Sequence, residues 1–353
     1  MTVVLAILLI SILIVVHELG HFATAKLFGV QVNEFSVFMG PAIWKKQIGE
    51  TLYAIRCIPI GGYCAMEGES EDTDNERSLQ KAAWWKRLII FAAGSGVNFI
   101  AGLLLTAIVL VPVQRLGAPV ISQIEDGCAL AGEHGIQVGD RILEVDGEKI
   151  YVQSDFSTIL SLNGGDVHDL VLERNGEKVV LDDFLMEKRI FDNGDGTTGL
   201  RYGFSFSLEE ATFAKKLEYV WNSSLDTVRM VRLSLKMLLT GKAGLADMSG
   251  PVAIVQVMSE TAAQSETGLD ALLSLLSFGA FLSINLAVMN MLPVPALDGG
   301  HIVCLLITTV VEGITKKKID SKYEAFLHNI GMILLLGLTA VIMFKDIFGL
   351  FKR

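Results

Sequence analysis

Residues 3–21 read VVLAILLISILIVVHELGH, an apolar run that ends in the pentapeptide His17-Glu18-Leu19-Gly20-His21. The part from Val3 to Val16 carries no charged residue and predicts a membrane-spanning helix. No basic segment precedes it and no small-residue cleavage site follows, so we interpret it as a retained span rather than a signal peptide. In a helix, the spacing of four places His17 and His21 on one face, where both imidazoles can hold one zinc ion.

A catalytic zinc ion takes three protein ligands and a water molecule, so this hypothesis requires a third ligand. Two histidines and a glutamate in or beside hydrocarbon are costly unless they have a function, although a satisfied His–Glu cluster at a helix end is the simpler alternative. The third ligand should be another ionisable residue at membrane depth. Asp298, which follows a proline-rich break, fits best, and His301 is the competing candidate. The other histidines are interpreted as ordinary polar residues: His134 and His168 in the extramembrane segment, and His328 in a cytoplasmic loop.

The amino-acid composition also indicates a membrane protein. The chain has 353 residues, of which 51% are hydrophobic and only 19% are charged, which is too apolar for an ordinary soluble enzyme. Its formal net charge of −10 and the absence of a basic stripe give no reason to expect a nucleic-acid partner. The four cysteines show no C-x-x-C spacing, so neither a disulfide framework nor a cysteine zinc site is expected.

About four segments are long and apolar enough to span a bilayer, roughly 3–26, 88–112, 272–311 and 327–350. The third is interrupted between Asn290 and Gly300 by two prolines and two glycines, which cannot occupy a regular helix. Irregular backbone at membrane depth is tolerated only where protein or a water-filled cavity surrounds it. The predicted fold class is therefore a polytopic α-helical membrane protein with a β-rich, PDZ-like domain inserted between its spans.

Basic residues concentrate in two loops. The first loop, about 27–87, and the last, which includes Lys316, Lys317, Lys318 and Lys322, are rich in lysine and arginine. The positive-inside rule places both loops in the cytoplasm. The long segment 113–271 and both termini are then expected on the opposite, extracytoplasmic side.

The segment from about 115 to 208 changes to short β-like runs. Asp146-Gly147 and Asn175-Gly176 stand between such runs, where hairpin turns require residues that tolerate positive φ. Residues 129–147 resemble the PDZ signature, which predicts a fold that binds an extended peptide beside its sheet; a spacer or lid is the alternative. We divide the chain into two halves of a membrane core, 1–114 and 272–353, the PDZ-like domain at 115–208, and a juxtamembrane linker at 209–271. The linker includes an amphipathic helix that lies on the membrane surface or packs on the PDZ-like domain.

The motifs together resemble the site-2 protease family of intramembrane zinc metalloproteases, in its bacterial branch with a single PDZ domain. The matching pieces run the whole length: H-E-x-x-H at 17–21, residues 35–41, 58–63 and 66–69, Gly94 to Asn98, Ser249 to Val252, and Asn290 to Gly300. The resemblance implies that His17, His21 and Asp298 bind Zn²⁺ and that Glu18 is the general base. Ser95 is a departure, because the family often has proline there.

The resemblance also implies a function: hydrolysis of peptide bonds in single-span membrane proteins, such as anti-sigma factors or remnant signal peptides, after a first cut by another protease. The expected location is the bacterial cell membrane, among its lipids, with the PDZ-like domain outside the cytoplasm. Asn98 and Asn290 are candidates for holding the substrate backbone or the oxyanion, or for hydrogen bonds between helices. The β-like segment 58–70 is expected to pair with an unwound substrate strand. A silent peptide-binding scaffold with structural zinc, or a transporter with broken helices, are the alternatives.

Overall fold

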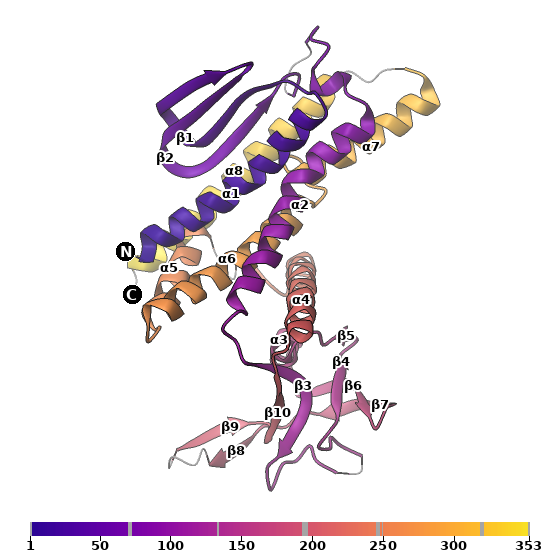
Figure 1. Ribbon diagram of the computed structural model, residues 1–353. Coiled ribbons are helices and arrows are strands. Elements are labelled where there is room, and N and C mark those ends of the chain that lie inside the picture. Colours follow the sequence, from indigo (N-terminus) through magenta and orange to yellow (C-terminus); the bar gives the residue numbers. More distant parts are fainter. Residues whose placement is uncertain are drawn as a thin grey trace. The chain divides into compact units, whose positions relative to one another are not determined.

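The computed structural model describes residues 2–69, 73–132, 134–192, 197–244, 248, 250–317 and 321–351. Among the motif residues named above, Lys318 and Ser249 lie outside this described part. The chain divides into two compact units (Figure 1): a helical unit, Met1–Val109 with Thr227–Arg353, and a β-rich unit, Leu110–Asp226.

The helical unit is built on long apolar helices. Among the described residues, five helices are long and apolar enough to cross a membrane: α1 (Thr2–Leu27), α2 (Trp84–Val109), α6 (Gly268–Asn290), α7 (Asp298–Thr315) and α8 (Ser321–Phe351). The shorter α5 (Pro251–Ala263) packs against α1 and α6, and α2 packs against α1, α6 and α7. Another long helix, α4 (Phe213–Leu239), has residues in both units and carries buried Val220 and Val231 and exposed Leu217 and Trp221. Its amphipathic character stays a prediction.

The predicted span 272–311 is two helices rather than one. Pro293 and Pro295 lack the backbone N–H that a continuous helix requires, so the chain leaves α6 after Asn290 and resumes helix only at Asp298. Both of these helix ends lie within 3.5 Å of one residue, His17 of α1. The break therefore lies at the level of the histidine motif.

A two-stranded hairpin, β1 (Val32–Ile48) and β2 (Thr51–Met66), packs against α1. Its buried side chains Val32, Phe35 and Cys64 join a core with Ile90 of α2 and Leu305 of α7. The segment 58–70, expected to be β-like, is strand as far as Met66 and belongs to this longer hairpin; residue 70 lies outside the described residues. A short 3₁₀ helix (Leu79–Lys81) leads from it to α2.

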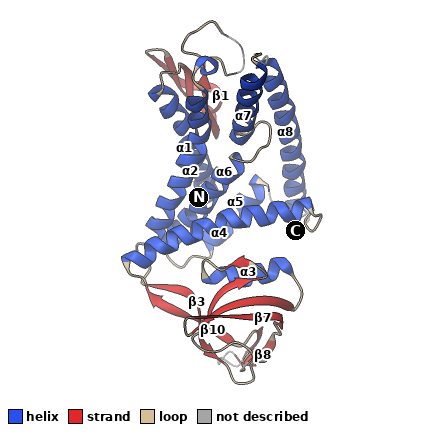
Figure 2. Ribbon diagram, turned by 90° about the vertical axis from the view of Figure 1, so that its right-hand side faces the viewer, coloured by secondary structure: helices blue, strands red, loops and turns tan. Residues whose placement is uncertain are grey.

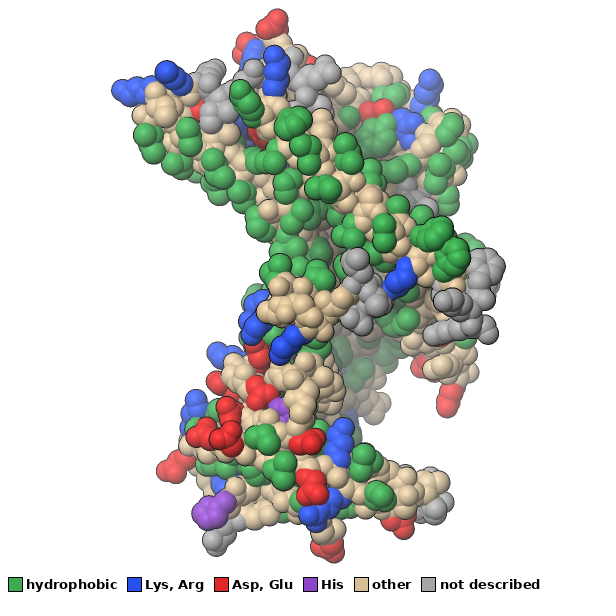
Figure 3. Space-filling view, turned by 180° about the vertical axis from the view of Figure 1, so that it is seen from behind, with side chains coloured by type: hydrophobic (Ala, Val, Ile, Leu, Met, Phe, Trp, Pro, Cys, Tyr) green, Lys and Arg blue, Asp and Glu red, His purple; other side chains and the backbone are tan. Residues whose placement is uncertain are grey.

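Hydrophobic side chains cover much of the flank of the helical unit, and lysine and arginine side chains gather at its upper end in Figure 3. Exposed apolar residues include Ile100 and Leu104 on α2 and Leu334 and Leu336 on α8. Large exposed apolar patches of this kind mark surfaces that contact a membrane or another protein. The structure therefore agrees with a membrane protein that carries a β-rich insert.

In the described part of the β-rich unit, six strands form a sheet in the order β10-β3-β4-β6-β7, with β5 paired to β4. The strands are β3 (Arg115–Ile124), β4 (Arg141–Val145), β5 (Glu148–Lys149), β6 (Val167–Arg174), β7 (Glu177–Leu185) and β10 (Phe204–Glu210). A separate hairpin joins β8 (Arg189–Asp192) to β9 (Thr198–Arg201).

One helix, α3 (Gln153–Asn163), packs against this sheet (Figure 2). Its Phe156, Ile159 and Leu160 enter a core with sheet residues such as Ile142 and Leu172. Both predicted hairpin turns are confirmed: the turns between β4 and β5 and between β6 and β7 have positive φ at Asp146-Gly147 and at Asn175-Gly176. The assignment of this unit as a PDZ domain stays a prediction.

Candidate metal centre

Helix α1 supplies two ligand candidates from one face. His17 and His21, one turn apart, are both 7% exposed, and their Nε2 atoms lie 3.2 Å from each other. The interval of four residues produces this approach, because it returns the chain to the same side of the helix.

Asp298, the first residue of α7, completes a triad. Its Oδ2 lies 3.2 Å from Nε2 of His17 and 3.4 Å from Nε2 of His21. Zinc ligands about 2.0–2.1 Å from a tetrahedral ion are separated from one another by about 3.3 Å. The three measured separations therefore match three corners of a tetrahedral zinc site.

The chemistry of these atoms also fits a cation. Nδ1 of His21 lies 2.8 Å from the carbonyl oxygen of Ile90, so Nδ1 carries the proton and Nε2 presents a lone pair toward the triad. Asp298 Oδ2 is buried and has no hydrogen-bond donor among the described residues. Lone pairs from three side chains thus converge on one point, which is the arrangement that Zn²⁺ stabilises.

Helix α2 packs against the two histidine rings of the triad at Gly94. A Cβ atom added there would lie 2.4 Å from Nε2 of His21 and 2.7 Å from Cε1 of His17. Only glycine leaves room for both rings at this position.

His301, the competing ligand, does not join the triad. Its ring stacks on those of Phe91 and His328, and its Nδ1 lies 3.6 Å from Oε1 of Glu324. The geometry therefore favours Asp298 as the third ligand.

The two asparagines lie on different sides of His17. Asn98 is fully buried, with Nδ2 3.5 Å from Nδ1 of His17, whereas Nδ2 of Asn290 lies 3.4 Å from Nε2, on the triad side. If His17 binds through Nε2, then Nδ1 carries a proton and needs an acceptor. Turning the Asn98 amide by 180° would supply one, because its Oδ1 is buried without a partner in the described part of the chain. Asn98 is therefore placed to orient His17, and Asn290 lies on the side of the triad.

Glu18 lies beside this centre without being part of the triad. It is half-buried, and its charge interacts with those of His17, His21 and Asp298. Strand β2 passes next to it: Ser11 Oγ of α1 donates a hydrogen bond of 2.7 Å to the carbonyl of Pro59, and a Cβ added at Gly62 would lie 3.8 Å from Cγ of Glu18. A strand backbone therefore borders the expected general base.

One residue of the region was misjudged from the sequence. His328 was assigned to a cytoplasmic loop although it falls at the start of the predicted span 327–350, and the structure places it on α8, only 6% exposed. The lysines before it suggested a loop. The helix that contains the apolar run after His328 in fact begins earlier, at Ser321. An ionisable residue inside an apolar run is a signal of function in a membrane protein, and that signal could have identified it.

Comparisons with known proteins identify the family of this chain. The sequence profile of peptidase family M50 matches residues 5–338. The chain is 34% identical over 348 residues to a protein of Clostridium perfringens named as a zinc metalloprotease, covering 98% of each chain. It is 35% identical over 348 residues to another of Clostridium acetobutylicum, covering 98% of this chain and 97% of the relative. It is also 27% identical over 432 residues to the regulator of sigma-W protease RasP of Bacillus subtilis, covering 99% of each. This chain therefore belongs to peptidase family M50, the site-2 protease family, and is an intramembrane metalloprotease that uses Zn²⁺.

Proposed function

We propose that this protein cleaves single-span membrane proteins at peptide bonds within or beside the bilayer, with zinc held by His17, His21 and Asp298. The observation that supports this most directly is the triad of ligand atoms, separated by 3.2–3.4 Å, on helices apolar enough to cross a membrane. Three protein ligands leave a fourth position open, which distinguishes a catalytic site from a closed structural one.

The proposed chemistry assigns each nearby side chain one task. Bound zinc would lower the pKa of a water molecule toward about 7 and polarise the scissile carbonyl. Glu18 accepts a proton from the attacking water and returns it to the leaving amine. Asn290 donates its amide N–H to the oxygen on which negative charge develops. Asn98 keeps the ring of His17 in the orientation that binding requires.

The substrate must reach Glu18 as an extended chain, because the amides of a helix are shielded by its own hydrogen bonds. We propose that β2 receives the unwound segment as an additional strand. The contact of Ser11 with Pro59 and the approach of Gly62 to Glu18 support this, since they bring strand backbone beside the general base.

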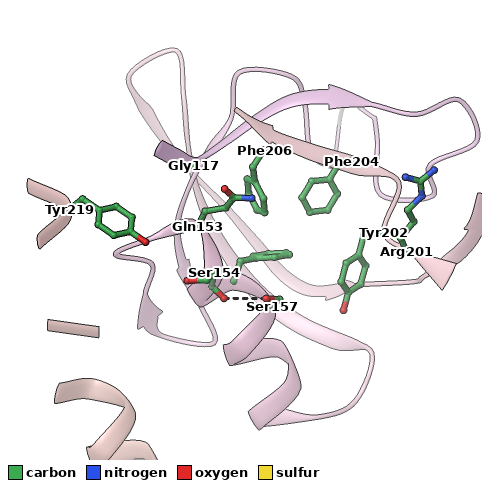
Figure 4. A pocket seen from close by; sticks show the side chains of 10 residues that line it. Gly117, Gln153, Ser154, Ser157, Arg201, Tyr202, Phe204, Phe206 and Tyr219 are labelled. Carbon is green, nitrogen blue, oxygen red and sulfur yellow. Dashed lines mark hydrogen bonds between the residues drawn. The ribbon is translucent and has the colours of Figure 1, made fainter. Parts of the chain in front are cut away.

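A second recognition site is proposed in the β-rich unit. A cavity of about 500 Å³ lies between α3 and the sheet, with Phe204 and Phe206 of the edge strand β10 on one side and Gln153 on the other (Figure 4). Tyr219 and Arg201 lie at opposite ends of the cavity in this view. A peptide strand beside β10 could place apolar side chains in the cavity, as in PDZ recognition.

We propose a location in the bacterial cell membrane, with the β-rich unit outside the cytoplasm. The lysines and arginines of the first and last loops support this orientation. Anti-sigma factors or remnant signal peptides, shortened by another protease, are the proposed substrates. A relative named as a regulator of sigma-W protease supports the first of these classes.

The decisive experiment replaces Glu18 with glutamine. This variant should fold and bind zinc as the wild type does, because Glu18 is not a ligand, while cleavage of a transmembrane test substrate by purified protein falls at least about 100-fold. Asp298→Asn, the matched variant of a proposed ligand, should instead lower zinc content. Wild-type cleavage by Glu18→Gln, with contaminating proteases excluded, would refute the assigned mechanism and favour the scaffold alternative.

A further inference from the structure

We propose that His328, on α8, is a positioning residue that holds the backbone carrying Asp298 and thereby sets the zinc affinity of the centre. The inference rests on the proposed ligand set.

The segment 291–297, which we call the break loop, is packed tightly on the first turn of α7. A Cβ added at Gly299 would lie 2.3 Å from the carbonyl oxygen of Leu292, and one added at Gly300 would lie 2.4 Å from that of Val294. The backbone N–H of Leu297 also donates to the carbonyl of Val294 at 3.1 Å. A displacement of the break loop must therefore move Asp298, which follows it directly.

The end of this loop is held in an unfavourable conformation. Ala296 has a φ of 80°, in the left-handed region that residues with a Cβ atom avoid. Its backbone N–H donates a hydrogen bond of 3.0 Å to Nδ1 of His328. A strained conformation persists only where its surroundings impose it, and this bond is one such constraint.

A second contact of α8 lies one turn further on. A Cβ added at Gly331 would lie 2.5 Å from both Cβ and the carbonyl oxygen of Pro295. Positions 328 and 331 share one face of the helix. His328 and Gly331 therefore both contact the break loop, His328 at Ala296 and Gly331 at Pro295.

His328 is itself fixed by its neighbours. Its ring lies parallel to that of His301, with centroids 3.6 Å apart, and His301 stacks in turn on Phe91 at 5.0 Å. Glu324 Oε1 lies 3.6 Å from Nδ1 of His301, and Glu324 Oε2 lies 3.9 Å from Arg87. The ring stack therefore connects α8 to α7 and α2.

These same residues, His301, Glu324 and His328, are close enough to suggest a second metal site. The hydrogen bond from Ala296 argues against it. Because Nδ1 of His328 accepts this bond, a neutral ring carries its proton on Nε2, which then has no lone pair for a metal. The cluster is arranged to hold the break loop.

Two pairs of variants in the full-length protein test the proposal. Gly331→Ala should press on Pro295, whereas Gly337→Ala is its control, because an added Cβ at Gly337 meets no atom within 4 Å. His328→Leu removes the acceptor, whereas His328→Asn keeps a side-chain oxygen near the place of Nδ1. The readouts are the Kd for Zn²⁺, from competition with a chelator, and the visible absorption of the Co²⁺-substituted protein.

We expect Gly331→Ala and His328→Leu to weaken Zn²⁺ binding about 10- to 100-fold and to alter the Co²⁺ spectrum, as loss of an outer-shell contact does elsewhere. Gly337→Ala and His328→Asn should remain within a few-fold of the wild type. Folded His328→Leu and Gly331→Ala proteins with wild-type Kd and spectrum would overturn the proposal, and so would two zinc ions per chain. Asp298→Asn distinguishes failure of this proposal from failure of the ligand set. If Asp298→Asn weakens Zn²⁺ binding and the α8 variants do not, the ligand set stands and the role of His328 is wrong.

Discussion

The most direct test of the metal centre adds a single methyl group at Gly94. In a Gly94→Ala variant, the new Cβ would lie 2.4 Å from Nε2 of His21, whereas ordinary van der Waals contacts begin at about 3.4 Å. The overlap is therefore about 1 Å. The ring of His21 cannot retreat freely, since its Nδ1 is bonded to the carbonyl of Ile90 on the same helix. Either the ring or α2 must shift by most of this distance.

A shift of that size exceeds what a metal site tolerates. Ligand distances in a zinc site hold to within about 0.2 Å, and disturbing the contacts that orient a ligand typically weakens affinity 10- to 100-fold. We expect Gly94→Ala to fall at or beyond the upper end of this range. Overpacking should also destabilise the fold by about 1–3 kcal/mol, which is too little to abolish folding of most proteins.

The assay is the Kd for Zn²⁺ of the purified full-length variant, with helix content measured alongside. Gly96→Ala is the matched control, because it adds the same methyl group to the same helix where no atom lies within 4 Å. Zinc affinity in Gly94→Ala within two-fold of that in Gly96→Ala would show that the two rings do not bind the metal in the observed arrangement.

Three further outcomes are expected. Asn290→Ala should lower kcat by about 100-fold with zinc content unchanged, the loss typical of one oxyanion donor; an unchanged kcat would remove it from the mechanism. Single cysteines at positions 75 and 175 of a cysteine-free variant should be labelled from the cytoplasm and from outside, respectively, and the reverse pattern would contradict the orientation. Burial raises the pKa of Asp146, but hydrogen bonds, first that of His168, outweigh it and lower the pKa below its ordinary value of 3.8. The pair therefore stabilises the β-rich unit at neutral pH by about 1–2 kcal/mol, and this is lost as the pH falls through the lowered pKa. Hydrogen exchange in β4 and β6 should be faster in His168→Leu at pH 7, and equal protection would refute the contribution.

Much of the fold follows from local patterns. The uncharged run before His17 predicts α1, and the turn residues Asp146-Gly147 predict a hairpin because positive φ is a local property. The sequence also identified Asp298 as a ligand candidate, since a carboxylate in an apolar segment requires a partner. It could not show that Asp298 meets both histidines, because that contact depends on how α7 packs against α1.

The remaining features depend on packing between distant segments. That Gly94 carries no side chain is evident from the sequence, but only the structure shows two imidazole rings above it. In the same way, a histidine at position 328 looks like part of a polar loop until α8 brings it to Ala296. The prolines after Asn290 showed that the predicted span is interrupted. They did not show that a second, separate helix begins at Asp298.

The negative charges of Asp298 and Glu18 give a physical reason for a cation at this centre. A site with Asp298 and Glu18 ionised carries two negative charges among apolar helices, and isolated charges in such surroundings are strongly unfavourable. A divalent cation bound to the triad balances both charges. In the proposed ligand set α1 supplies two ligands and α7 the third, so a bound metal would also link two helices that the chain separates by the whole β-rich unit. With this ligand set, zinc binding and correct placement of α7 would be coupled, and each contact that fixes Asp298 would contribute to the affinity for the metal.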